Sequence, residues 1–96
     1  MKVKQLKKIL DSGKEVVLID VREPEEYKKG LKVKGAKNIP MGQMFVDSGT
    51  GKLPKDKKII TICKTGGRCD IVARELKKKG YDIESLEGGA TAWKTN

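Results

Sequence analysis

The sequence contains no histidine, and this absence excludes several kinds of active site. A Cys-His or Ser-His nucleophile pair needs an imidazole, and so do many metal sites. The two cysteines, Cys63 and Cys69, are too few for a four-thiolate zinc site or for a framework of disulfides. We therefore expect no metal and no cofactor. Any reactive thiol in this chain must be activated by something other than an imidazole.

Long apolar segments are absent as well. The longest apolar runs are 16–19 and 59–62, far shorter than the roughly 20 residues of a membrane-spanning helix. The first residues lack the apolar segment and the small-residue cleavage site of a secretory signal. The sequence thus predicts a cytoplasmic protein with no membrane partner.

Aromatic residues are scarce, and this affects whether the positive charge of the chain indicates nucleic-acid binding. Twenty-two lysines and arginines against thirteen acidic residues give a net charge of +9, and a basic surface can bind the phosphates of nucleic acid. The basic residues are scattered along the chain, however, and few aromatic side chains are available for stacking on bases. We predict no nucleic-acid partner and interpret the charge as a solvated surface that favours small anions.

The order of the predicted elements indicates one α/β domain over residues 1–96. Short apolar runs alternate with segments of helical periodicity, which is typical of a mainly parallel sheet flanked by helices on both faces. Strands are expected at 16–19, 36–39, 58–62 and 83–86, and helices at 3–10, 24–29, 71–79 and from 90 onward. One or two helical turns are expected at 41–45, and a loop at 47–51.

The strongest chemical signal is the segment Cys63-Lys64-Thr65-Gly66-Gly67-Arg68, which joins a buried strand to a helix. Open α/β sheets usually bind their ligands at such a junction. Gly66 and Gly67 let backbone amides turn inward, and the helix adds the positive end of its dipole. These effects favour an anion, so we expect a Cys63 thiolate with a lowered pKa. The alternative is that Cys63 is a small hydrophobic residue that ends a core strand.

Four segments carry the motifs of one family: residues 17–27 with Asp20-Val21-Arg22, residues 35–40 with Gly-Ala-Lys-Asn-Ile-Pro, the loop 63–68, and residues 86–93 with Gly-Gly-Ala-Thr-Ala-Trp. Together they resemble the single-domain rhodaneses, sulfurtransferases whose active loop typically reads Cys-Arg-x-Gly-x-Arg. The segments occur in the family's order and extend over almost the whole chain. The resemblance implies the rhodanese-like α/β fold.

The resemblance also implies a mechanism. The Cys63 thiolate would attack the outer sulfur of a donor such as thiosulfate, release sulfite and hold a persulfide. An acceptor such as cyanide, a thiol or a protein cysteine would then take that sulfur. The implied partners are a small anionic sulfur donor and a donor or acceptor protein. The implied anion-binding residues are those that follow Cys63, with two supporting residues: Lys64, Thr65, Gly66, Gly67 and Arg68, and Asp20 and Arg22.

Three residues in or next to these segments differ from the family pattern or have more than one expected role: Asp20, Lys64 and Cys69. Asp20 is expected either to pair with a loop arginine or to act as a simple turn or capping carboxylate. Cys69 is either a resolving thiol or a packed small residue. Lys64 replaces the family's usual arginine and loses bidentate geometry.

Other functions compete with thiosulfate transfer. Phosphatases and arsenate reductases of related fold need five residues between cysteine and arginine, whereas four separate Cys63 from Arg68. A non-catalytic binding module and a protein-persulfide carrier are the remaining alternatives.

Overall fold

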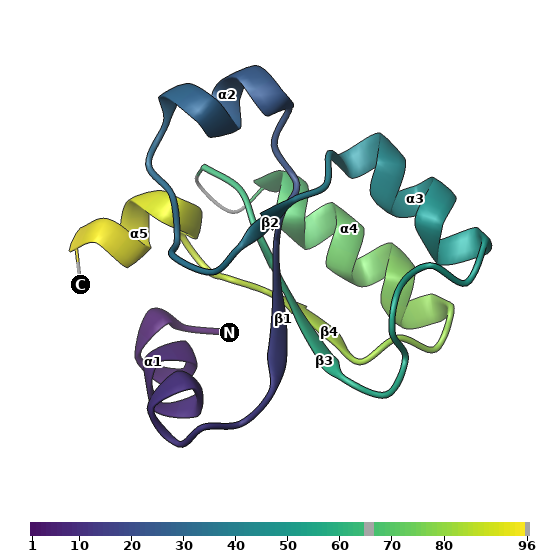
Figure 1. The fold of residues 1–96 in the computed structure, drawn as a ribbon, viewed down its shortest axis with the longest axis horizontal. Coiled ribbons are helices and arrows are strands. Elements are labelled where there is room, and N and C mark those ends of the chain that lie inside the picture. The colour runs from purple at the N-terminus through teal and green to yellow at the C-terminus, as the bar shows by residue number, and fades with distance from the viewer. Residues whose placement is uncertain (65–66, 96) are drawn as a thin grey trace.

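A computed structural model describes residues 1–64 and 67–95, which form a four-stranded sheet with helices on both faces (Figure 1). The strands lie in the order β2-β1-β3-β4, and every neighbouring pair is parallel. This confirms the expected α/β fold with a parallel sheet. The strands are β1 (Val16–Asp20), β2 (Lys37–Asn38), β3 (Lys58–Ile62) and β4 (Ile83–Ser85). The helices are α1 (Val3–Asp11), α2 (Pro24–Lys29), α3 (Met41–Gly49), α4 (Gly67–Lys78) and α5 (Gly89–Thr95).

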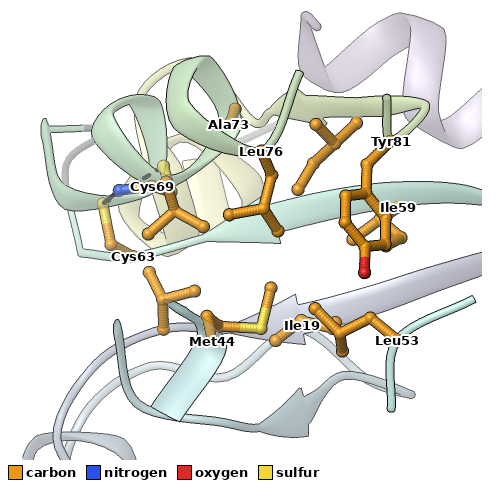
Figure 2. Packing of buried hydrophobic residues seen from close by; sticks show 12 residues of the cluster. Ile19, Met44, Leu53, Ile59, Cys63, Cys69, Ala73, Leu76 and Tyr81 are labelled. Atoms are coloured by element: carbon orange, nitrogen blue, oxygen red, sulfur yellow. Dashed lines mark hydrogen bonds between the residues drawn. The ribbon is translucent and has the colours of Figure 1, made fainter. Parts of the chain in front are cut away.

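The two central strands bury both of their faces. Successive side chains of a strand point to opposite faces of a sheet, so the apolar runs of β1 and β3 divide between two cores. Ile19 and Ile59 pack in the core under α3 and α4. Leu18 and Ile60 pack in the core under α1 and α5. Cys63 belongs to the first of these cores and lies below the start of α4 (Figure 2).

The helices are short, and the longest one in the described part of the chain, α4, has 12 residues. Within residues 1–64 and 67–95 we find no helix with the length and apolar character that a membrane crossing requires. Pro24 opens α2, where its missing N–H is not needed and its fixed φ suits a helix start. Figure 1 shows α2 beyond the carboxyl ends of β1 and β3, which is where the candidate site lies.

The predicted loop at 47–51 is wrong in its first half, because α3 continues to Gly49. Asp, Ser and Gly favour turns locally, but contacts with the rest of the chain determine the structure here. Met44 and Ser48 are buried, and the Tyr81 hydroxyl donates a hydrogen bond to the Ser48 carbonyl at 3.0 Å. The strand expected at 36–39 is also shorter, since only Lys37–Asn38 pair with β1.

Candidate functional site

Cys63 directly follows β3, and the start of α5 fixes its backbone. The amide of Ala90 donates to the Cys63 carbonyl at 2.8 Å, and the amide of Thr91 donates to the Lys64 carbonyl at 3.2 Å. Gly89 makes this approach possible, because its φ is +58° and a Cβ there would lie 2.2 Å from the Cys63 carbonyl oxygen. Glycine is therefore required at this position, and α5 acts as a clamp on the segment that carries the thiol.

The Cys63 sulfur is buried against the first turn of α4. The residue is 2% exposed, and the backbone amide of Cys69 donates to its Sγ at 3.5 Å. An amide in the first turn of a helix carries part of the positive end of the helix dipole. The described part of the site therefore contains a feature expected from the sequence, a helix start directed at the thiol. The loop residues Thr65 and Gly66 lie outside the described residues, and Gly67 is the first residue of α4.

The second cysteine lies against the first. A thiol–thiol hydrogen bond joins Cys63 Sγ and Cys69 Sγ at 3.2 Å, and Cys69 is completely buried. The hydrogen bond to Cys63 and the burial of the thiol raise the pKa of Cys69. Burial and the contact with Cys63 thus both disfavour a thiolate at Cys69. Thr61 Oγ1 donates to the Cys69 carbonyl at 2.9 Å and fixes the start of α4 on β3.

Arg68 reaches the rim of the site but is paired with a carboxylate. Its Nη1 and Nη2 donate to the two carboxylate oxygens of Glu26, on α2, at 2.5 and 2.7 Å. The hydrogen bonds from Arg68 lower the pKa of Glu26 to about 2, and those to Glu26 raise the pKa of Arg68. Nothing in the local sequence points to Glu26, because the two residues lie 42 positions apart.

Asp20 and Arg22 form a buried ion pair at the carboxyl end of β1. Their side chains are 0% and 2% exposed, and Arg22 Nη2 donates to Asp20 Oδ2 at 2.6 Å. Asp20 also accepts from Nε and from the backbone amide of Arg22. The hydrogen bond to Asp20 raises the pKa of Arg22. Of the two roles expected for Asp20, pairing with a loop arginine is wrong, since Arg22 occupies the carboxylate and Arg68 pairs with Glu26. The bond from the Arg22 backbone amide fits the other role, that of a turn carboxylate.

Two further residues hold this ion pair in place, and sequence reasoning did not single them out. Asn38 Nδ2, on β2, donates to the carbonyls of Asp20 and Arg22 at 3.1 and 2.9 Å. Gly30 allows Arg22 to pass, because a Cβ at Gly30 would lie 2.7 Å from Arg22 Nη1. A polar residue in a short predicted strand was the available signal for Asn38. These contacts hold Arg22 in place next to the C-terminal end of α2.

A pocket of about 430 Å³ opens between α2, Lys64 and the start of α5. Most of its exposed surface is apolar, although the lining includes several charged residues. Lys29 and Lys64 add positive charge, and Glu26 adds the carboxylate that holds Arg68. Small anions fit such an environment better than cations do. The lining consists of Arg22, Glu26, Lys29, Gly30, Leu31, Lys64, Ala90 and Thr91.

Comparisons with known proteins agree with this fold. The family model described as "Rhodanese-like domain" matches residues 2–96. The putative sulfurtransferase YtwF of Bacillus subtilis is 38% identical over 88 residues, which cover 92% of this chain and 82% of YtwF. A crystal structure of a rhodanese-related protein from Thermoplasma volcanium superposes with a TM-score of 0.84 at 26% identity, covering 99% of this chain and 89% of that one.

One relative is much longer than this chain. The probable adenylyltransferase/sulfurtransferase MoeZ of Mycobacterium tuberculosis is 38% identical over 91 residues, which are 94% of this chain but 23% of MoeZ. The chain therefore spans about a quarter of the length of MoeZ, and the rest of MoeZ has no counterpart in the matched segment.

Proposed function

This chain belongs to the rhodanese-like domain family, and we propose on that premise that it is a sulfurtransferase in which Cys63 carries the sulfur as a persulfide. YtwF and MoeZ are both described as sulfurtransferases, which supports a transferase role. The observation that carries the proposal is the position of Cys63, at the carboxyl end of β3 with its Sγ accepting the Cys69 amide from the first turn of α4.

The proposed chemistry needs no group beyond the thiolate and an anion-stabilising environment. Cys63 Sγ attacks the outer sulfur of thiosulfate or a related sulfane-sulfur donor. The donor's S–S bond breaks, and sulfite leaves with the bonding electrons. An acceptor nucleophile then attacks the outer sulfur of the persulfide and returns Cys63 to the thiolate. The Cys69 amide stabilises the negative charge on Cys63, and Lys64 contributes positive charge at the pocket edge.

A second candidate function is supported by the Glu26–Arg68 pair. In a thiosulfate enzyme, Arg68 would bind the anionic donor, but here both of its terminal nitrogens donate to Glu26. A small anion must therefore displace a bidentate carboxylate before it can bind Arg68. A donor protein that delivers a persulfide directly to Cys63 avoids this competition. The pair thus favours a persulfide carrier loaded by a protein over an enzyme specialised for thiosulfate.

The proposed chemistry needs Cys63 as a reduced thiol, so we keep a cytoplasmic location, where thiols stay reduced, as part of the proposal. A non-catalytic binding module is the weakest of the alternatives, because Cys63 and the helix start that faces its sulfur are both in place.

The test measures sulfur loading and transfer separately. The reduced protein is mixed with thiosulfate, or with a protein persulfide donor, and thiocyanate is measured after cyanide is added. Cys63→Ser should abolish transfer from both donors while its urea-unfolding midpoint stays close to that of the wild type. Loading by the protein donor but not by thiosulfate would identify a carrier. Transfer that persists in Cys63→Ser would exclude the proposed function.

A further inference from the structure

The two cysteines come from different elements, yet their sulfur atoms are in contact. Cys63 Sγ and Cys69 Sγ lie 3.2 Å apart, and both residues are buried. A disulfide S–S bond measures about 2.05 Å, so a shift of about 1 Å would join the two atoms. Figure 2 shows the pair at the end of the core between α4 and the sheet, where the first turn of α4 meets the end of β3.

We propose that Cys69 is a resolving thiol that discharges the Cys63 persulfide as hydrosulfide and leaves a Cys63–Cys69 disulfide. This inference rests on the proposed function, because it needs a persulfide on Cys63. It adds a second outcome to the reaction. A persulfide that meets an acceptor transfers its sulfur, and one that meets none is released as sulfide.

The step balances without an added oxidant. Cys69 Sγ attacks Cys63 Sγ, the inner sulfur of the persulfide, and a new Sγ–Sγ bond forms. The bond between Cys63 Sγ and the outer sulfur breaks, and the outer sulfur leaves with the electron pair. The Cys69 proton goes to that departing sulfur, which leaves as hydrosulfide. The outer sulfur is reduced and the two cysteine sulfurs are oxidised. An external dithiol then reduces the disulfide by thiol–disulfide exchange and restores both thiols.

The position of Cys69 matches this role. External acceptors approach the outer sulfur of a persulfide, whereas Cys69 already contacts the inner one. Thr61 holds the Cys69 carbonyl at 2.9 Å, so the first turn of α4 keeps the thiol in place. The hydrogen bond to Cys63 and burial raise the pKa of Cys69, and this slows the attack because the thiolate is the nucleophile. The contact between the two sulfur atoms, rather than the acidity of Cys69, therefore supports the role.

A simple packing role for Cys69 makes a different prediction. Cys69 is completely buried in the core that also holds Val72 and Leu76, so its replacement changes stability under either view. Packing alone, however, gives Cys69 no influence on which sulfur product appears. The product, rather than the stability, therefore distinguishes the two roles.

The experiment follows one turnover without a reductant. Reduced protein, freed of reductant under anaerobic conditions, is mixed with excess thiosulfate and with the protein persulfide donor in separate samples. Intact mass and released sulfide are measured over time. The wild type should lose two hydrogens, show a Cys63–Cys69 link by peptide mapping and release one sulfide per chain. Cys69→Ser and Cys69→Ala should keep one added sulfur and release at least roughly tenfold less sulfide.

A matched control alters the same buried face of α4 but replaces no cysteine. Ala73 lies one turn after Cys69 and is 3% exposed, so Ala73→Ser disturbs the same core. It should release sulfide as the wild type does. Wild type that keeps a stable persulfide as long as Cys69→Ser would overturn the inference and leave the proposed function standing. If neither Cys69 variant folds, peptide mapping of the wild type decides the question. If the wild type and the folded Cys69 variants all gain no sulfur and form no disulfide with either donor, the proposed function itself fails.

Discussion

Replacing Asp20 with asparagine should remove a large part of the stability of this protein. The change keeps the shape of the side chain but leaves the Arg22 guanidinium, 2% exposed, without its counter-charge. Arg22 Nε and Nη2 both donate to the Asp20 carboxylate, and within the described residues Nη2 keeps one further acceptor, the Leu31 carbonyl at 2.5 Å. Breaking a buried ion pair by removing one partner costs about 3–5 kcal/mol. Domains are stable by about 5–15 kcal/mol, so this loss is a substantial fraction of the total.

Equilibrium unfolding in urea, followed by far-UV circular dichroism, measures this loss. The control is Glu15→Gln, which removes the exposed ion pair between Glu15 and Lys57 at 3.5 Å. Exposed pairs contribute about 0–1 kcal/mol, so this control should unfold almost as the wild type does. The double replacement Asp20→Leu with Arg22→Met should be less destabilised than Asp20→Asn, because it leaves no charge buried. Equal losses in Asp20→Asn and Glu15→Gln would refute the argument.

Three further predictions concern Gly89 and the Glu26–Arg68 ion pair. In the same urea assay, Gly89→Ala should lower the free energy of unfolding by at least about 1–2 kcal/mol, because alanine disfavours the left-handed backbone at this position. The clash of its Cβ with the Cys63 carbonyl should add to this loss, and unchanged stability would contradict the prediction. Glu26→Gln should raise kcat/KM for thiosulfate several-fold by releasing Arg68, whereas the control Glu25→Gln should not. If the two variants had the same kcat/KM, Glu26 would not be competing with thiosulfate for Arg68. The pKa of Glu26 is lowered from about 4.5 to about 2, so its ion pair with Arg68 stabilises the fold above pH 4.5 and is lost as the pH falls towards 2. The difference in unfolding free energy between the wild type and Glu26→Gln should therefore shrink over that range.

The main elements of the fold could be predicted because they follow from local pattern. The apolar runs at 16–19 and 58–62 became the two central strands, and Pro24 opens a helix where expected. The last turn of α3 could not be predicted in this way. Its residues favour a turn on their own, and the helix continues because Ser48 is buried and bonded to Tyr81, which lies 33 positions later.

The position of the thiol could also be predicted, but its partners could not. The sequence places Cys63 between a strand and a helix, and the structure confirms that location. The pairing of Arg68 with Glu26 depends on where α2 comes to lie, which no local pattern specifies. The contact between Cys63 and Cys69 depends on the direction of one side chain after the strand and on the first turn of α4. Such contacts arise from tertiary packing, so composition and spacing left the role of Cys69 open.

The charges around the pocket bear on the choice of donor. Arg22 and Arg68 are both held by carboxylates of the chain, so the two guanidinium groups near the site are already engaged in bidentate pairs. Lys29 and Lys64 line the pocket, and an ammonium group attracts an anion without fixing its orientation. A net charge of +9 raises the local concentration of anions, and that attraction weakens as salt screens it. For the proposed sulfur transfer, this arrangement favours a donor whose own protein surface supplies the orientation over a free small anion.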